Sequence, residues 1–421
     1  MVLGLLMARA GVEVTVLEKH KDFLRDFRGD TVHVSTLDLI DELGLGPRFA
    51  QVPHRRIEKM RMQFDEGAAT VADMRRLPGT HQYIALVPQW DFLDMLADAA
   101  SEEPTFTLRR NAEVTDIVRD GDRVVGVRYR DRIAGTDHEI RATLTVACDG
   151  RSSAVRAAAG LVPRSFGAPM DVWWFRLPRH DTDPIGGVAR ISTGQMCVMI
   201  DRGDYWQCAY LIRKGSDAEL RAAGIEELRR RYAALLPWMA DRMPELASFD
   251  QVSLLDVELN RLRRWDLEGL LLIGDAAHAM SPVGGVGINL AVADAVAAAR
   301  ILGPALRSGG IVPRSLLRRV QRRRLLPTAI VQGVQQLAHR GLIGSIGLGE
   351  PVSLPHTTTA AGVQDATIPD APLAALPQPL RLLQRFPALQ GIPARLVAFG
   401  PLPEHAPMWA RRPPTEAPTR A

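Results

Sequence analysis

An acidic turn followed by a glycine-rich loop is the part of this sequence best suited to chemistry. Asp275 follows the apolar run 270–273, and the segment 282–289 reads Pro-Val-Gly-Gly-Val-Gly-Ile-Asn. The apolar run predicts a buried strand, and the small residues of 290–301 predict a helix. A carboxylate at the carboxyl end of a strand suits the hydroxyl groups of a sugar or sugar alcohol. The glycines would let the backbone N–H groups at the start of the helix approach a flat ring.

A second acidic turn follows another apolar run. Residues 144–148 predict a buried strand that ends in Asp149-Gly150, and residues 155–159 continue in a helical pattern. An Asp-Gly pair alone marks an ordinary turn. At the end of a strand, however, the carboxylate can orient neighbouring groups, and we expect Asp149 to orient Arg156 and the backbone around it.

The N-terminal residues predict the second half of a dinucleotide-binding β-α-β unit. Residues 3–10 have a helical pattern, Gly11 ends it, and 12–17 alternates like a strand that ends at Glu18. The first strand and the G-x-G-x-x-G turn that would hold a pyrophosphate are missing from the expected place. Two explanations stay open: the true protein begins roughly 15–20 residues earlier, or the chain is a genuine truncation with weakened cofactor binding.

Together these segments resemble the FAD-dependent aromatic hydroxylases, the p-hydroxybenzoate hydroxylase-like group A flavoprotein monooxygenases. In that family the Asp of the Gly-Asp pair, here Asp275, binds the ribityl chain of FAD. Glu18 stands where the family binds the adenosine ribose, and Arg28 where it contacts the pyrophosphate. The Asp149-Gly150 pair stands where the family has a motif linked to both FAD and NAD(P)H. The resemblance also implies FAD contacts for Gln89, Pro282, Gly284, Gly285, Gly287, Ile288 and Asn289.

Three of these residues also have simpler interpretations. Glu18 could be a solvent-exposed residue at a strand end, Arg28 a surface arginine, and Gln89 a residue near a helix N-cap.

The resemblance implies a reaction as well as a cofactor. NADPH or NADH reduces FAD, O₂ adds at flavin C4a, and the hydroperoxide transfers one oxygen atom to an aromatic or polyketide-like molecule. This chemistry requires no protein nucleophile and no metal. His33 and His278 are weak acid–base candidates, and we expect neither to be an essential base.

Two other functions stay open at this stage. The chain could be an FAD-dependent reductase or dehydrogenase of the same superfamily, or an inactive remnant that has lost FAD binding. The substrate is open too, as is the choice among hydroxylation, epoxidation and Baeyer–Villiger oxidation, because fold-level analogy does not select a reaction.

The predicted architecture is α/β, a Rossmann-like FAD-binding domain into which an antiparallel substrate-binding sheet is inserted. The FAD-binding domain would comprise 1–56, 86–164 and 256–310, and the substrate sheet 57–85 and 165–255. The remainder, 311–421, would hold C-terminal helices and a proline-rich tail. Candidate pocket residues in the inserted sheet are Trp173, Trp174, Phe175, Met196, Met199, Trp206 and Tyr210, with Trp173, Phe175, Met199, Trp206 and Tyr210 preferred. Strand alternation places only about half of such residues on one face, so the alternative is ordinary core packing.

Composition limits the classes of partner. The 421 residues are 46% hydrophobic and 24% charged, which is typical of a globular protein. The net charge is +4, and the positive charges are almost all arginines. A compositional bias of the source genome explains the arginine content more simply than attraction for anionic ligands. No basic, aromatic-rich patch indicates nucleic acid binding.

Cysteines and hydropathy address the compartment. Cys148, Cys197 and Cys208 have neither metal-ligand spacing nor a disulfide framework, and no apolar run is long enough for a membrane span. We therefore expect a cytoplasmic monomer or homodimer without stable membrane insertion, whose partners are a small-molecule substrate and O₂.

Overall fold

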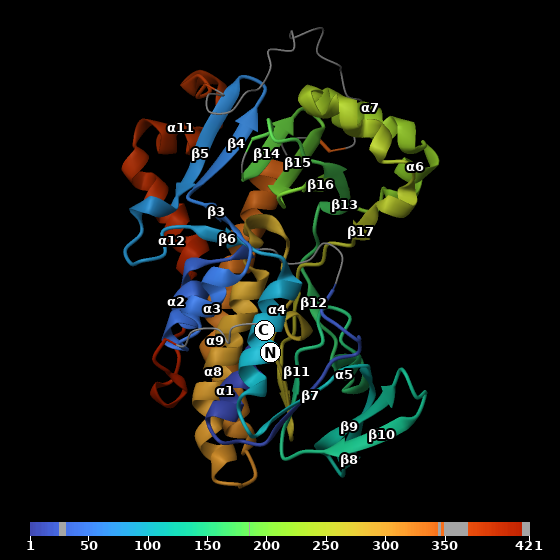
Figure 1. Ribbon diagram of the computed structural model, residues 1–421, viewed down its shortest axis with the longest axis vertical. Helices are drawn as coiled ribbons and strands as arrows, with labels where there is room; N and C mark the ends of the chain where they lie inside the picture. Colours follow the sequence, from blue (N-terminus) through green and yellow to red (C-terminus); the bar gives the residue numbers. More distant parts are fainter. Residues whose placement is uncertain (25–30, 185, 344–346, 349–368, 415–421) are drawn as a thin grey trace.

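The computed structural model describes residues 1–24, 31–184, 186–343, 347–348 and 369–414, and Figure 1 shows the arrangement of its elements. The helices are α1 (Val2–Arg9), α2 (Val34–Glu42), α3 (Gly46–Gln51), α4 (Gln89–Ser101), α5 (Ala154–Ala158), α6 (Asp217–Ala222), α7 (Ile225–Leu235), α8 (Gly287–Arg307), α9 (Arg314–Ala338), α11 (Gln378–Arg385) and α12 (Gly391–Phe399). The strands are β1 (Val14–Leu17), β2 (Thr31–Val32), β3 (Arg55–Ile57), β4 (Lys59–Phe64), β5 (Gly67–Asp73), β6 (Ile84–Leu86), β7 (Phe106–Arg109), β8 (Ala112–Asp120), β9 (Arg123–Asp131), β10 (Asp137–Arg141), β11 (Thr145–Ala147), β12 (Arg164–Ser165), β13 (Met170–Pro178), β14 (Gly187–Ser192), β15 (Gln195–Asp201), β16 (Tyr205–Arg213), β17 (Ser253–Leu255), β18 (Asn260–Arg261), β19 (Asp266–Leu267) and β20 (Leu270–Leu272). Helices and strands alternate up to β20, and the described residues after β20 form helices, which agrees with the predicted α/β class.

Two parallel strand pairs form the part of the fold that carries the acidic turns. β1 pairs with β7, with Val14 opposite Phe106, and β11 pairs with β20, with Thr145 opposite Leu270. Among the described residues, no strand joins β1 to β11 by hydrogen bonds. Because β11 and β20 are parallel neighbours, the turns at their carboxyl ends lie side by side.

β7 pairs with a strand that lies far from it in the sequence. It runs parallel to β1, whereas the strands that follow it, β8, β9 and β10, form a separate antiparallel sheet. Packing under α1 explains this pairing. Gly4 of α1 has no side chain, so the helix approaches Phe106 of β7 and Val16 of β1 closely and covers both strands.

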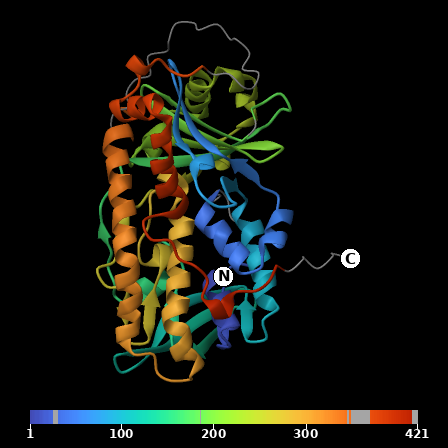
Figure 2. The same cartoon turned by 90° about the vertical axis from the view of Figure 1, so that its left-hand side faces the viewer.

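The long helices α8 and α9 run side by side along this part of the molecule (Figure 2). α8 extends beyond the predicted range 290–301 at both ends and also packs against α1. The stretch Val283–Arg307 is long and apolar enough to span a membrane by composition alone. Its residues Val292, Ala295 and Val296 lie in the main hydrophobic core, so this helix packs against other parts of the protein.

Within the described residues a seven-stranded sheet lies at the opposite end of the molecule from α1 (Figure 1). The strand order is β17-β13-β16-β15-β14-β4-β5, and β4 runs parallel to β14. Strands from 59–73 and from 170–255 therefore share one sheet. The domain boundaries given above stay a prediction.

One face of this sheet, which we call the helix face, packs against α7 and the 3₁₀ helix η2 (Pro237–Glu245). It carries all five preferred pocket candidates, Trp173, Phe175, Met199, Trp206 and Tyr210, each of them buried. Their polar atoms are satisfied internally: the Trp206 indole N–H donates to Asp183 at 2.8 Å, and the Tyr210 hydroxyl donates to Gln195 at 2.9 Å. These side chains form a closed core, which contradicts their prediction as pocket lining.

The C-terminal residues return along the molecule after α9. α11 and α12 pack against β5, and residues 401–413, which we call the return segment, run back past α8 to α2 (Figure 2). Trp409 contacts Gly303 of α8, and the backbone of Pro413 lies against Gly44. The return segment thus joins the two long helices to the N-terminal elements.

Candidate functional site

Asp275 lies in the turn that follows β20, in the 3₁₀ helix η4 (Gly274–Ala276). Gly274 has φ 58°, a left-handed conformation that suits glycine, and its N–H donates to Asp294 Oδ2 at 3.0 Å. The Asp275 side chain is 33% exposed, and Arg151 Nη2 lies 3.7 Å from Oδ2. The turn is therefore anchored from inside while the carboxylate stays accessible to a ligand.

The glycine loop follows this turn and leads into α8. Gly284 and Gly285 have φ of 82° and 63°, and a Cβ on Gly285 would collide with Thr31. The Thr31 hydroxyl donates to the Gly285 carbonyl at 2.8 Å, so the second glycine and Thr31 lock the loop against β2. Residues 282–289, which include Pro282, are all partly exposed.

The start of α8 offers unpaired N–H groups. In the described part of the chain, no side chain caps this helix, and Leu290 N–H makes the first intrahelical bond, to Val286 at 3.1 Å. The N–H groups of Gly287 and Ile288 precede that bond and have no intrahelical partner. A helix N-terminus of this kind favours an electron-rich ligand group.

Asn289 holds the neighbouring segment in place. Its Oδ1 accepts hydrogen bonds from the His33 backbone N–H at 3.0 Å and from the Thr36 hydroxyl at 2.7 Å. Its amide nitrogen is buried and has no hydrogen-bond partner among the described residues. A buried amide without a partner is a rare feature that a bound ligand would satisfy.

His33 lies beside Asn289 but is sealed from solvent. Its Nδ1 is 2.7 Å from the Val397 carbonyl, a contact that requires a proton on Nδ1. Burial lowers the pKa of His33 to about 4, although the bond to Val397 opposes the shift. The imidazole is neutral at physiological pH, so it cannot supply a proton there.

The Asp149 turn is tied to the Asp275 turn by arginines. The Asp149 carboxylate accepts from the Ser153 hydroxyl at 2.5 Å and from the Val155 N–H at 3.1 Å, which caps α5. Arg156 donates to the Ala276 carbonyl at 3.1 Å and also to the Arg151 carbonyl. The expected link from Asp149 to Arg156 therefore runs through Ser153, whose Oγ accepts the Arg156 N–H.

The other residues that were predicted to contact FAD lie at or near the ends of helices and strands. Glu18 follows β1, and its carboxylate accepts from the His20 N–H at 3.0 Å. Gln89 is the first residue of α4 and is partly exposed, and Gly150 has φ 87° with open space around it. Arg28 lies outside the described residues.

His278 is buried beneath the turn. Its Nε2 is 2.6 Å from Asp294 Oδ2, and its ring lies 4.8 Å from that of Trp265. Burial raises the pKa of Asp294, but His278 and Arg324 outweigh this effect and leave it lowered, so the carboxylate is ionised. His278 supports the turn and has no surface toward a ligand.

The sequence analysis did not identify Asp294 and Arg324, two buried charged residues that support the Asp275 turn. Arg324 donates from Nε to Asp294 Oδ1 at 3.0 Å, and both side chains are almost fully buried. The available signal was Asp294 itself, a carboxylate within a helix of small apolar residues. Nothing local in the sequence identifies Arg324 as its partner.

These residues fit FAD. An exposed carboxylate, an uncapped helix start and the unpartnered Asn289 amide lie along one strand–turn–helix unit. In the described residues no group of three or more His, Cys, Asp or Glu side chains could hold a metal ion.

Comparison with known proteins identifies the family. The family described as FAD binding domain matches residues 1–334. This chain belongs to that family. The 6-methylpretetramide 4-monooxygenase of Streptomyces rimosus is 33% identical over 324 residues, which cover 76% of this chain and 77% of the relative. The 12-dehydrotetracycline 5-monooxygenase/anhydrotetracycline 6-monooxygenase of the same species is 25% identical, with coverage of 97% and 86%. The protein is an FAD-dependent monooxygenase that acts on a small molecule.

Solved structures share the fold. Pseudomonas aeruginosa PqsL in complex with 2-aminobenzoylacetate has a TM-score of 0.68 at 19% identity, with coverage of 82% of this chain and 93% of that chain. The OxyS anhydrotetracycline hydroxylase of Streptomyces rimosus has a TM-score of 0.66 at 20% identity, with coverage of 94% and 73%. These likenesses confirm the predicted FAD-binding fold. A dialkyldecalin synthase of Streptomyces rugosporus, 23% identical with coverage of 96% and 87%, is also similar, so the fold serves more than one reaction.

Proposed function

We propose that this monooxygenase oxygenates a polycyclic aromatic molecule of the polyketide type, with NADPH or NADH as reductant and O₂ as co-substrate. The observation that carries the proposal is the contact between the glycine loop and the seven-stranded sheet. Val283 of the loop packs in one cluster with residues of the face opposite α7, which we call the loop face. A flat substrate held against this face would lie next to the cofactor loop. The tetracycline-type names of the relatives support this substrate class.

The loop face has the composition of an aromatic binding surface. Trp174 and Val198 are partly buried there, and Met196 and Leu211 are buried beside them. Trp174 and Met196 were among the wider set of pocket candidates. Indole and thioether groups bind flat apolar rings well, and an apolar surface excludes water from the reacting centre.

We assign the cofactor contacts by chemistry. The Asp275 carboxylate accepts hydrogen bonds from ribityl hydroxyls, and Glu18 from the adenosine ribose. The N–H groups of Gly287 and Ile288 and the unpartnered Asn289 amide would be the donors available to the flavin ring. Gln89 and the Asp149-Gly150 turn would contact the pyrophosphate and reductant side of FAD. For Arg28, which lies outside the described residues, the pyrophosphate contact rests on the family resemblance alone.

Bound FAD supplies hydride acceptance from the nicotinamide and activation of O₂ for transfer of one oxygen atom. The protein's own residues bind and orient. Asp275 and the helix start fix the cofactor, the glycines allow its close approach, and the loop face positions the substrate. His33 stays neutral and His278 stays enclosed, so neither delivers a proton to the reacting atoms.

The reaction is tested with the purified full chain, a nicotinamide, labelled O₂ and a panel of polycyclic phenols such as 6-methylpretetramide. We expect substrate-stimulated NADPH or NADH oxidation and one labelled oxygen atom in the product. A product formed without labelled oxygen would favour a reductase, a dehydrogenase or a synthase and would overturn the proposal.

We also propose that the three predicted sequence divisions correspond to cofactor, substrate and C-terminal units. A cytoplasmic location, a monomeric or homodimeric state and the absence of nucleic acid or membrane partners belong to the same proposal. Fractionation of cells that express the protein tests its location. Light scattering of the purified protein tests its oligomeric state.

A further inference from the structure

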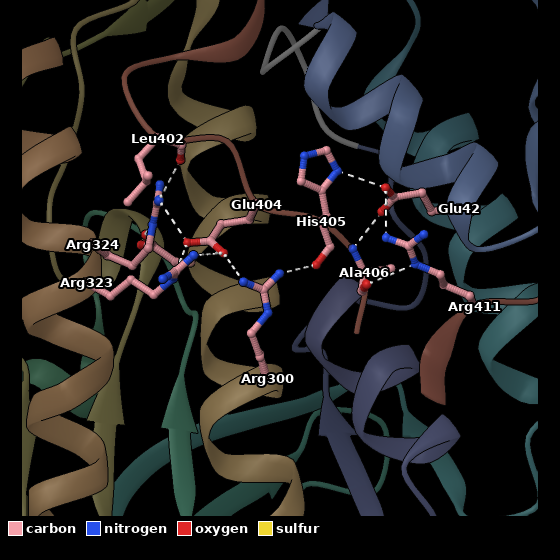
Figure 3. A network of polar contacts seen from close by, with 10 residues as sticks. Glu42, Arg300, Arg323, Arg324, Leu402, Glu404, His405, Ala406 and Arg411 are labelled. Atoms are coloured by element: carbon pink, nitrogen blue, oxygen red, sulfur yellow. Dashed lines mark hydrogen bonds and ion pairs between the residues drawn. The ribbon is translucent and has the colours of Figure 1, made fainter. Parts of the chain in front are cut away.

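The return segment carries a buried acidic residue, Glu404, that faces three arginines of α8 and α9 (Figure 3). Arg323 donates to both carboxylate oxygens, at 2.7 and 2.9 Å, and Arg300 lies at 3.2 Å. Arg324 Nη1 lies at 3.4 Å from Glu404 and 3.1 Å from the Leu402 carbonyl. The Glu404 side chain is only 1% exposed, so its charge is compensated by these arginines and not by water.

Arg324 continues the chain of contacts inward to the acidic turn. Its Nε binds Asp294 Oδ1, and the other oxygen of Asp294 accepts the Gly274 N–H and contacts His278. Gly274 precedes Asp275 directly. A continuous series of buried charges, Glu404 to Arg324 to Asp294, therefore connects the return segment to the backbone of the turn.

We infer that Glu404 is a positioning residue for the Asp275 turn, acting through Arg324 and Asp294. This inference rests on the proposed role of Asp275 in FAD binding. The FAD binding domain match ends at residue 334, so Glu404 lies outside the segment that defines the family. The return segment thus helps to set cofactor affinity from a position far along the sequence.

The electrostatic reason is the balance of charge around Arg324. The Glu404 carboxylate faces the guanidinium groups of Arg300, Arg323 and Arg324, whereas Asp294 pairs with Arg324 alone among these arginines. The neutral amide of a Glu404→Gln variant would leave the three cations with Asp294 as the remaining buried carboxylate, and their mutual repulsion would displace Arg324. Asp294 would then lose its fixed partner, and the Gly274 N–H its fixed acceptor.

Glu42 provides a matched control on the same segment. It accepts the Ala406 N–H at 2.6 Å and pairs with His405 at 2.8 Å and Arg411 at 3.3 Å, so it also fastens the return segment (Figure 3). These contacts lie on the α2 side, and none of them is made by Arg324 or Asp294. Arg300 contacts both sides, because it donates to the His405 carbonyl and pairs with Glu404. Glu42→Gln therefore loosens the segment while it leaves Glu404, Arg324 and Asp294 and their contacts with one another in place.

The decisive experiment is amide hydrogen exchange of the full chain without FAD, measured on peptides that cover residues 273–279. We expect Glu404→Gln to speed exchange there at least about threefold, since an exposed amide loses protection, and Glu42→Gln to leave it as in wild type. Equal exchange in wild type and Glu404→Gln would overturn the inference. Equal acceleration in both variants would also overturn it, because general loosening of the segment would then be sufficient.

FAD titration adds a second readout. We expect Glu404→Gln to weaken FAD binding about tenfold, or about 1.4 kcal/mol, and to change the visible circular dichroism of the bound flavin. Arg324→Lys keeps the charge and should recover part of the affinity that Arg324→Met loses. If Glu404→Gln does not fold, hydrogen exchange of residues 273–279 is compared between Arg324→Lys and Arg324→Met. Equal exchange in these two variants would overturn the inference. Wild type that binds no FAD would refute the proposed function, whereas the exchange result stands without FAD.

Discussion

The two faces of the seven-stranded sheet have similar side chains and different surroundings. On the helix face, Phe175 and Tyr232 pack edge to face at 5.1 Å, and both are fully buried. On the loop face, Trp174 stays partly exposed and shares a cluster with Val283 of the glycine loop. Aromatic residues next to each other in one strand thus serve either as core or as a candidate binding surface, according to what packs over them.

The largest expected effect tests that difference directly. Phe175→Ala should lower the free energy of unfolding by about 4 kcal/mol, because it leaves a cavity in a closed core. Trp174→Ala should lower the free energy of unfolding by only about 1–2 kcal/mol, as expected for a partly exposed residue. Its main effect should be a higher KM for the substrate. Urea unfolding measures the first effect, and steady-state kinetics the second.

If Trp174→Ala destabilised the protein as strongly as Phe175→Ala, the loop face would be a core as well. The substrate surface would then have to be sought elsewhere.

The second prediction concerns FAD binding at the Asp275 turn, which precedes the glycine loop. Asp275→Ala should raise the Kd for FAD about 100-fold, or about 2.7 kcal/mol, because ribityl hydroxyls lose a charged acceptor. Fluorescence titration of the flavin measures this change. Asp256→Ala is a suitable control: the Asp256 carboxylate pairs with Lys214 and the residue contacts Arg151 only through its carbonyl. Unchanged FAD occupancy in Asp275→Ala would remove Asp275 from the site.

The third prediction concerns how the free energy of unfolding depends on pH through the buried His33. Its folded pKa of about 4 lies below the unfolded value of about 6.5, so unfolding takes up a proton and the folded state loses stability as pH falls. Between pH 8 and pH 5 this one group should cost about 2 kcal/mol. Urea unfolding at both pH values should show a smaller loss in His33→Gln than in wild type. The same loss in both proteins would contradict a buried, neutral His33.

The smallest expected effect is that of Glu18→Ala. A ribose contact nearer solvent should be worth about tenfold in FAD affinity or less, about 1.4 kcal/mol. The same titration as for Asp275 measures it. Loss of all FAD binding in Glu18→Ala, with little change in Asp275→Ala, would reverse the assignment of the two ends of the cofactor.

The sequence predicts the site better than it predicts its support. The Gly274-Asp275 turn, the glycine loop and the start of α8 are contiguous, so local strand, turn and helix signals were sufficient to place them. Strand alternation divides Trp173 and Phe175 from Trp174, but it does not tell which set the helices cover. Only the amphipathic pattern of α7 hints at the covering element.

Local sequence patterns did not predict which strands pair or which charged residues meet when they lie far apart along the chain. The pairing of β7 with β1 depends on how α1 packs, and Asp294, Arg324 and Glu404 come from three segments far apart along the chain. Each looks like an ordinary charged residue in the sequence. Their burial together is a property of the tertiary structure alone.

The most direct test of the account is the visible absorption spectrum of the purified full chain, before and after addition of FAD and removal of excess cofactor. The account predicts flavin bands at near-stoichiometric occupancy in wild type and a strong loss of them in Asp275→Ala. A wild-type protein that stays colourless after FAD is added would contradict the claim that the Asp275 turn and the glycine loop hold this cofactor.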